Sequence, residues 1–229
     1  MKTDIAPPGR SALRGLAKPG RKPGVRERAA QETQDAILRA ATRIFAKHGF
    51  SGGRVEQISK AAKSHDRMIY YYFGSKEGLY IAVLENLYRR FNEAEAALKL
   101  NADAPEQALV AVIGFIWTYY QRNPEFITLL NDENLHRGKH IAKSLRAHDY
   151  SSPATRILDT VLASGAAQGV FRAGVSARDL YLMIASLNYF YLSNRHTLSA
   201  FFGDKLDSSQ ALQDWHAFAV DAVLRTVKP

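Results

Sequence analysis

The residues that could do chemistry gather in one segment, from Lys63 to Lys76, which combines basic, hydrogen-bonding and aromatic side chains. Lysine and arginine neutralise phosphates, and tyrosine hydroxyls donate hydrogen bonds to phosphate oxygens, so such groups hold a protein on a nucleic-acid backbone. Arginine can form a two-pronged hydrogen bond with guanine, and an apolar side chain can touch the methyl group of thymine. The segment therefore predicts recognition of double-stranded DNA.

Several side chains of this segment have an alternative to DNA contact. Asp66 carries the wrong sign for a polyanion, and the alternative for it is an ion pair with Arg67 or Lys63. The aromatic run 70–73 is expected to place one or two rings in a core, and Lys76 has the alternative of a capping or solvated lysine at a helix start. With these alternatives open, the candidate DNA-binding residues are Arg54, Lys63, His65, Asp66, Arg67, Met68, Tyr70, Tyr71, Tyr72 and Lys76.

The basic charge of the chain lies at the same end as this segment. The sequence has 229 residues and a formal net charge of +9. Residues 1–30 hold eight basic side chains against two acidic ones, residues 31–76 hold eight against four, and the rest is nearly neutral. This asymmetry is typical of a polyanion-binding end on an ordinary body, although a solubilising surface is an equal alternative for charge alone.

The elements around the segment are predicted from apolar residues that recur at helical spacing. A first helix runs from Gln31 to a glycine cap at Gly49. Two short helices follow, over 55–62 and 66–72, separated by a break at 63–65, and a long helix opens at Ser75. Two short helices around a tight turn are the outline of a helix-turn-helix unit, whose second helix enters the major groove.

The remaining sequence adds an arm and a larger helical region. Residues 1–28 are rich in proline and glycine breaks and poor in large apolar groups, so we interpret them as a flexible basic arm. The sequence thus predicts an all-α protein with this arm, a three-helix helix-turn-helix domain at 29–76 and a helical domain at 77–229, without any strand pattern. Proline, glycine and asparagine separate further predicted helices near 105–122, 124–136, 139–149, 153–168, 176–196 and 208–227.

The order and spacing of residues in the helix-turn-helix region resemble a known family. The matched stretch runs from about Ala36 to Leu84 and is similar to the TetR family of transcriptional regulators. From Gly49 onward it looks especially like the branch that contains the pyrimidine-utilisation repressor. The motifs that carry the resemblance are Ala40-Ala41-x-x-Ile44-Phe45-Ala46-x-x-Gly49-Phe50, then Val55-x-x-Ile58, then Tyr70-x-Tyr72-Phe73-x-Ser75-Lys76-Glu77-x-Leu79.

The resemblance implies roles for individual residues. Tyr72 and Lys76 match positions that bind phosphates, and Tyr70 matches a position that contacts DNA at the edge of the groove. Arg54 lies at a helix start where a backbone phosphate is usually met, although the family often has threonine there.

Three further positions depart from the family pattern. The usual turn glycine is Lys63, which must accept the backbone angle that the turn demands. The usual glycine and threonine of the reading helix are Arg67 and Met68. The DNA sequence that is recognised therefore does not carry over from the family.

The resemblance also implies that residues from about 85 onward form a domain that binds a small-molecule effector and makes a homodimer. The helices 176–196 and 208–227 are the expected dimer pair, although their apolar stripes are equally typical of core burial. The effector pocket is expected among the middle helices, mostly apolar with a few polar groups. Its candidates, each with plain core packing as the alternative, are Phe115, Trp117, Tyr120, Phe126, Tyr181, Asn188 and Tyr189.

Other classes of protein are disfavoured. The chain has no cysteine, which excludes thiolate metal sites, and it lacks the glycine-rich phosphate loop and the common hydrolase motifs, so no enzyme is expected. His136 and His140 have a metal-compatible spacing with Glu133, but Gly138 lies between them, and neither a metal nor a cofactor is expected. No apolar run reaches the roughly 18 residues of a membrane helix, and no signal-like region is present, so we expect a cytoplasmic protein.

The residues and the resemblance together predict a sequence-specific DNA-binding transcriptional regulator, a repressor that an effector releases from its operator. The alternative is a helical protein-interaction module without specific DNA binding. Lys63 and Arg67, which replace family glycines, leave room for that alternative.

Overall fold

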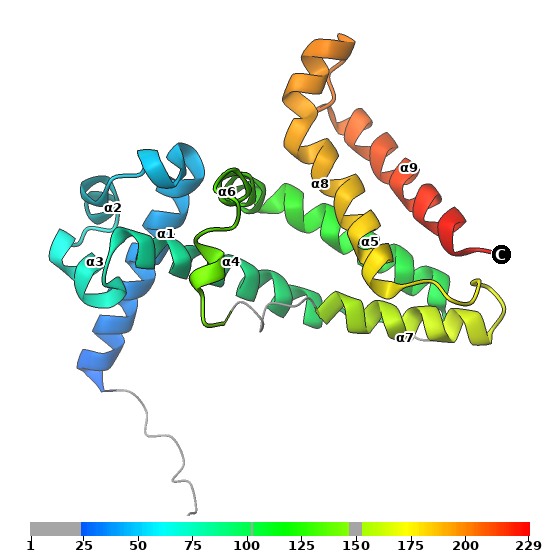
Figure 1. Ribbon diagram of the computed structural model, residues 1–229, viewed down its shortest axis with the longest axis horizontal. Coiled ribbons are helices and arrows are strands. Elements are labelled where there is room, and N and C mark those ends of the chain that lie inside the picture. Colours follow the sequence, from blue (N-terminus) through cyan, green and yellow to red (C-terminus); the bar gives the residue numbers. More distant parts are fainter. Residues whose placement is uncertain (1–23, 102, 147–152) are drawn as a thin grey trace, which may run out of the picture.

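The computed structural model describes residues 24–101, 103–146 and 153–229, and within these ranges the regular structure is helical, without strands (Figure 1). The all-α prediction is confirmed. The elements are α1 (Val25–Gly52), α2 (Val55–Ala61), α3 (Asp66–Phe73), α4 (Lys76–Ala96), α5 (Pro105–Arg122), α6 (Pro124–Leu135), the 3-10 turn η1 (Ile141–Lys143), α7 (Pro153–Ala167), α8 (Ala177–Phe202) and α9 (Ser209–Val227).

Helices α1 to α3 form a small head at one end of the molecule (Figure 1). Their apolar faces meet the first turns of α4 in a common core, which buries Ile37, Phe45, Ile58, Ile69 and Leu79 completely or nearly so. Burial of such large side chains contributes about 1.5–3 kcal/mol each, which is what holds short helices such as α2 and α3 in place.

Helix α4 connects the head to the rest of the chain. The hydroxyl of Ser75 accepts a hydrogen bond from the amide of Gly78 at 2.9 Å and caps its start. Its far half packs against α7, and Phe91 in that half contacts aromatic rings of α5 and α6. Helix α4 therefore has contacts in the head and in the rest of the molecule.

Helices α5 to α9 form the body, in which α5 packs against α7, α8 and α9. Pro105 and Pro124 stand at the first positions of α5 and α6, where a missing amide proton costs nothing. The hydroxyls of Ser176 and Ser208 cap α8 and α9. Helix α6 lies between the head and α8, so it contacts both parts of the molecule.

The structure corrects three predicted boundaries. Helix α1 begins at Val25, so residues 25–28 are helical rather than part of an arm, while residues 1–23 lie outside the described residues. Helix α8 continues past residue 196 to a left-handed cap at Gly203.

The third correction concerns the helix predicted at 139–149, of which only the 3-10 turn η1 forms within the described residues. Arg137 and Gly138 both have a positive φ, of +59° and +70°, and turn the chain away from the axis of α6. Within the part of the chain that the structure describes, no helix is long and apolar enough to cross a membrane.

Candidate nucleic-acid interface

The turn between α2 and α3 fixes how the second short helix leaves the first. Lys63 adopts a left-handed backbone conformation with φ of +51°, which is the angle that the family's glycine would take without strain. The amide of Ser64 donates to the carbonyl of Ser59 at 2.9 Å. The hydroxyl of Ser59 donates to the carboxylate of Asp66, so the two helices are hydrogen-bonded to each other directly.

This contact takes the place of the ion pair that the sequence offered for Asp66. The sequence suggested an ion pair with Arg67 or Lys63, but no such pair is found among the described residues. The half-buried carboxylate of Asp66 instead holds the start of α3 against Ser59. Asp66 thereby fixes the start of α3 relative to α2.

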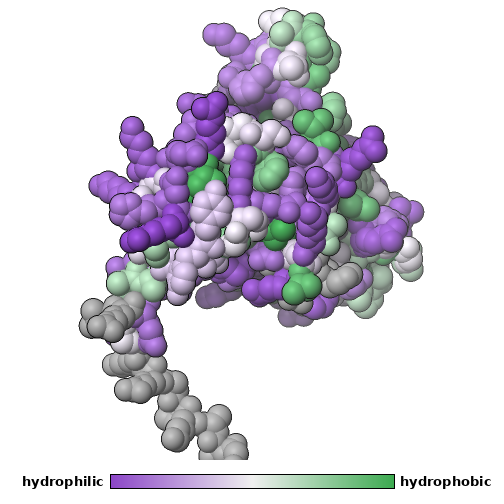
Figure 2. All heavy atoms as spheres, turned by 60° about the vertical axis from the view of Figure 1, so that its left-hand side comes forward, coloured by the Kyte–Doolittle hydropathy of each residue, from purple (hydrophilic) through white to green (hydrophobic). Residues whose placement is uncertain are grey.

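The outward face of α3 carries exposed side chains of the types that read DNA. His65 and Arg67 are exposed at its first turn, and Tyr70 and Tyr71 are exposed further along, Tyr71 by 77%. Ile69 lies on the opposite face and is fully buried. Figure 2 shows the side of the molecule that carries the head, and hydrophilic side chains crowd it.

Met68, Tyr72 and Phe73 are half-buried and pack against the core of the head. The prediction that one or two rings of the aromatic run would pack in a core is confirmed for Tyr72 and Phe73. A half-buried tyrosine can still present its hydroxyl at the surface, so packing and phosphate contact are compatible for Tyr72.

The two cations expected at phosphates lie at helix starts. Arg54 precedes the first residue of α2, and its side chain is exposed. At the start of α4, the ammonium group of Lys76 lies 4.8 Å from the centre of the Phe50 ring and donates to the carbonyl of Ser51 at 3.3 Å. Partial burial lowers the pKa of Lys76, and the nearby Glu56 carboxylate opposes this shift. These contacts position Lys76 at the surface where α1 and α4 meet.

A polar junction that the sequence analysis missed connects the head to α6. The carboxylate of Asp132 accepts hydrogen bonds from the amide of Phe50 at 2.8 Å and from the hydroxyl of Tyr80 at 2.7 Å. Gly49 has φ of +68°, and a Cβ atom there would lie 2.7 Å from Asp132 Oδ1. We call Gly49, Phe50, Tyr80 and Asp132 the head–body junction. No local sequence signal marks it, because its members come from three helices.

The two histidines with metal-compatible spacing belong to the same region. The Nδ1 atom of the buried His140 lies 2.7 Å from a carboxylate oxygen of Glu133, whose other oxygen accepts from the amides of His140 and Ile141. The ring of His140 packs against Phe50 with 4.4 Å between ring centres. His136 Nδ1 lies 2.7 Å from the carbonyl of Asp132. These partners give both histidines a structural role, and among the described residues no group of ligands could hold a metal ion.

Three of the predicted effector-binding residues belong to one aromatic cluster, and Trp117 lies outside it. Tyr120 and Phe126 are buried and pack together with 5.4 Å between their ring centres. Phe115, Tyr120 and Phe126 all pack on the ring of Phe91 of α4, whereas Trp117 lies toward α9, stacked on His216 at 5.8 Å. The contacts of Trp117 fit its core-packing alternative.

Helix α8 supplies the other three effector candidates. Asn188 is 0% exposed, and neither its amide nitrogen nor its oxygen has a hydrogen-bond partner in the described structure. Tyr181 and Tyr189 are half-buried, and Tyr189 donates to the side chain of Asn131 on α6. An unpartnered buried amide is costly, so the surroundings of Asn188 are suited to a polar ligand group.

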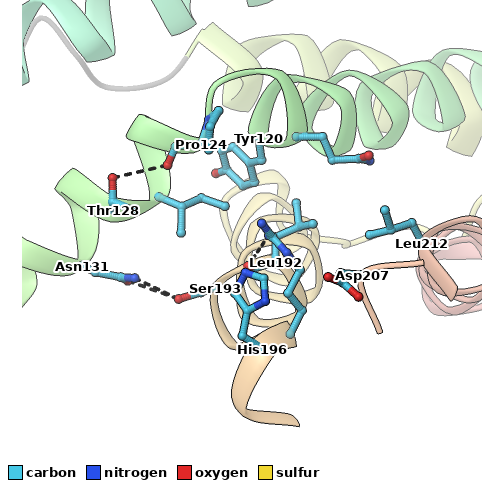
Figure 3. A pocket seen from close by; sticks show the side chains of 12 residues that line it. Tyr120, Pro124, Thr128, Asn131, Leu192, Ser193, His196, Asp207 and Leu212 are labelled. Carbon is cyan, nitrogen blue, oxygen red and sulfur yellow. Dashed lines mark hydrogen bonds between the residues drawn. The ribbon is translucent and has the colours of Figure 1, made fainter. Parts of the chain in front are cut away.

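A cavity of about 320 Å³ opens between α5, α6, α8 and the start of α9 (Figure 3). Tyr120 is the predicted candidate that lines it. The side chains of Asn131 and Ser193 are hydrogen-bonded at 3.0 Å at one end, and Asp207 lies at the other. Sequence reasoning missed the polar part of this lining, which consists of Gln121, Thr128, Asn131, Ser193, Arg195, His196 and Asp207.

Comparison with known proteins gives a consistent result. Residues 37–83 match the family model for bacterial regulatory proteins of the tetR family, and residues 105–223 match the tetracyclin repressor-like C-terminal domain. The transcriptional repressor NicS of Pseudomonas putida is 53% identical over 208 residues, covering 91% of this chain and 98% of NicS.

Two further similarities concern the head and the fold. The transcriptional regulator RutR of Escherichia coli is 47% identical over 64 residues, 28% of this chain and 30% of RutR, in agreement with the resemblance of the head to that branch. The transcriptional regulator SCO4942 from Streptomyces coelicolor superposes with a TM-score of 0.63 at 23% identity, covering 86% of this chain and 99% of that one.

Proposed function

This chain belongs to the TetR family of bacterial transcriptional regulators, and from that premise we propose that it is a repressor that a small-molecule effector releases from its operator. The protein is a DNA-binding regulator by its family, and NicS is a repressor by name. We place its action in the cytoplasm, with the DNA. We further propose that the body binds its effector without converting it.

The observation that carries the proposal is the set of exposed side chains on α3 and beside it. His65 and Arg67 stand at the start of α3, the end that meets base edges in helix-turn-helix proteins. A two-pronged hydrogen bond from Arg67 to guanine would discriminate by about 1–3 kcal/mol. Arg54 at the start of α2, and Tyr72 and Lys76 at the far end of α3, supply phosphate contacts, which fix the register of α3 in the groove.

The dimer is proposed to form through α8 and α9, by their outer faces. Leu180, Ile184 and Val223, which belong to the predicted stripes, are buried within a single chain and therefore form core. Large apolar side chains that remain exposed on the same helices are Leu182, Phe190, Phe201, Phe202 and Phe218. Pairing of two such faces would cover them and place two reading helices on half-sites about 34–36 Å apart or a multiple of that distance.

The effector is proposed to bind in the body near Tyr120. The cavity of about 320 Å³ is of the size that takes a small ligand, and the unpartnered amide of Asn188 lies in the same body. A ligand with both apolar and hydrogen-bonding groups would suit the mixed lining. It acts by binding better to a conformation in which the reading helices no longer match the half-site spacing.

The test is binding of the purified full chain to the DNA upstream of its own gene, titrated with salt and with unrelated competitor DNA. We expect a protected palindrome that resists competitor. Arg67→Ala should weaken binding to this palindrome by about 1–3 kcal/mol and relax specificity at one base position. Tyr72→Phe, which keeps the packed ring, should weaken binding to every sequence alike.

The matched control is Arg178→Ala, which removes the same charge from an exposed position on α8 and should leave DNA affinity unchanged. Binding that falls steeply with salt and shows no preference among sequences, in wild type and Arg67→Ala alike, would contradict the proposal. The interaction module without specific DNA binding would then be the better description.

A further inference from the structure

A second pocket, of about 220 Å³, lies where α1, α4 and the start of α6 meet. We propose that it binds a compact phosphate-bearing anion, at a place that includes none of the residues of the operator and effector sites proposed above. We call it the arginine pocket, and its lining residues are Arg39, Thr42, Arg43, Asn86, Arg90 and Glu125.

Helical spacing brings these side chains to one place. Arg39, Thr42 and Arg43 are three and four residues apart, so they share one face of α1. Asn86 and Arg90 are four residues apart on α4 and face the same pocket. Two helices that cross near each other thus bring three guanidinium groups to a single hollow.

Among the described residues, positive charge exceeds negative charge in the arginine pocket. Within the described part of the chain, no ion pair of Arg39, Arg43 or Arg90 is found. Glu125 is the carboxylate among the lining residues, so three positive charges face one negative charge. Like charges held together repel, and a bound anion would relieve this repulsion.

Neutral groups add hydrogen-bond donors. The side-chain oxygen of Asn86 accepts from Arg89 at 2.7 Å, which leaves its amide nitrogen to donate. Helix α6, of 12 residues, begins beside Glu125 at Pro124, and its N-terminus carries a positive partial charge without a side-chain cap.

The size and chemistry of the pocket define the class of ligand. A volume of about 220 Å³ is smaller than the usual 300–1,000 Å³ of sites for drug-sized molecules, so the bound part is compact. The planar fork of arginine matches phosphate oxygens in two-pronged geometry. The phosphate can belong to a small metabolite or to the DNA backbone, and the test separates these sources.

The location gives the anion a regulatory effect. Arg39 and Arg43 belong to α1 of the head, while Arg90 lies in the far half of α4, which packs against α7 of the body. An anion bound to both sides favours one position of the head relative to the body. By linkage, the bound anion changes the affinity of the protein for DNA by a certain factor, and bound DNA changes the affinity of the protein for the anion by the same factor.

The test is calorimetric titration of the full chain, free of DNA, with inorganic diphosphate at constant ionic strength. We expect saturable binding of one diphosphate per chain. Arg43→Gln and Arg90→Gln should each weaken it at least tenfold, and Arg43→Lys, which keeps the charge but not the fork, should weaken it less. Arg178→Gln removes an equal charge on α8 and should stay within twofold of wild type.

Binding that does not saturate, or that Arg178→Gln weakens as much as Arg43→Gln, would overturn the proposal as general electrostatic attraction. Urea midpoints of all variants confirm that each is folded. Because this titration contains no DNA, its outcome is independent of whether the operator proposal holds.

A second titration, with labelled duplex DNA from upstream of the gene, identifies the source of the phosphate. If a small metabolite supplies it, Arg43→Gln binds DNA as wild type does in diphosphate-free buffer. Diphosphate then shifts the DNA affinity of the wild type and not of Arg43→Gln. If the DNA backbone supplies it, Arg43→Gln weakens DNA binding directly, and diphosphate competes with DNA for the wild type.

Discussion

Lys63 holds a backbone conformation that side chains avoid, in the turn that orients α3. We expect Lys63→Gly to raise the free energy of unfolding by about 1 kcal/mol, because glycine takes a left-handed angle without strain. The same change should weaken DNA binding and lower its salt slope by roughly 0.9, because one cation near the phosphates is lost. Urea denaturation and a salt titration of DNA affinity measure the two effects.

The control for this prediction is Lys60→Gly, which removes an exposed lysine from the regular helix α2. There, glycine should lower the free energy of unfolding by about 1 kcal/mol. A destabilising effect of Lys63→Gly as large as that of Lys60→Gly would mean that the turn does not strain Lys63.

Gly49 combines a positive φ with a close neighbour. Gly49→Ala should lower the free energy of unfolding by about 2–4 kcal/mol, because the backbone conformation costs about 1–3 kcal/mol and the new methyl group displaces Asp132. Urea denaturation measures the loss. Gly74→Ala is the matched control, since Gly74 also has a positive φ, of +73°, but meets nothing within 4 Å. Equal losses at the two positions would show that the contact with Asp132 adds nothing.

At the scale of elements, the head–body junction connects α1, α4 and α6 through one carboxylate. Asp132→Ala should destabilise the protein by about 1–3 kcal/mol for each donor left unpaired, the amide of Phe50 and the hydroxyl of Tyr80. Tyr80→Phe removes one of these donors and keeps the ring. A double-mutant cycle of the two changes should give a coupling energy of at least about 0.5 kcal/mol in urea denaturation.

The readout that separates coupling from local stability is DNA affinity. If α6 holds the head in its DNA-binding position, Asp132→Ala should weaken operator binding, and Asp132→Asn, which keeps an oxygen acceptor, should restore most of it. Operator binding that is unchanged in Asp132→Ala would limit the junction to a stabilising role.

The element boundaries show what sequence reasoning could and could not reach. Pro105 and Pro124 mark the starts of α5 and α6 because proline suits a first helical turn, and both predictions are confirmed. Within the described residues, the helix expected at 139–149 is wrong because the chain becomes extended at Ser144, with ψ of 125°, directly after η1. The hydroxyl of Ser144 donates to Glu85 on α4, and helical periodicity carries no sign of this tertiary contact.

The same division holds for the candidate sites. The exposed residues of α3 were predictable because the family motif fixes their spacing. The junction was not, since Phe50 and Asp132 lie 82 positions apart and meet only in the folded chain. On α8, the helical spacing of apolar residues is clear from the sequence. The packing of α5 and α9 decides which of its apolar stripes faces the body and which faces outward.

At the scale of the whole molecule, we expect buried tyrosines to make the fold less stable at alkaline pH. Burial raises the pKa of Tyr88 to about 12 and raises the pKa of Tyr120 further. An unfolded tyrosine has a pKa near about 10, so above that pH the unfolded chain loses protons that the folded chain keeps. The free energy of unfolding should therefore fall as pH rises above about 10, by up to about 1.4 kcal/mol per pH unit for each such tyrosine.

Urea denaturation between about pH 9 and pH 11 measures this dependence. Tyr120→Phe, which keeps the buried ring, should reduce the pH dependence of the free energy of unfolding by about one proton. An identical slope in wild type and Tyr120→Phe would contradict the linkage.

The carboxylate of Asp132 also sets a rule for hybrid repressors, in which a foreign reading head is grafted onto this body to redirect it to other genes. A graft joined at the turn before α4 would keep the native Tyr80 but exchange Gly49 and Phe50, and any side chain at position 49 would collide with Asp132. A graft joined after Tyr80 would exchange all three partners together. We therefore expect a functional hybrid when the fusion point lies inside α4, after Tyr80, and the foreign head has a glycine at the end of its first helix.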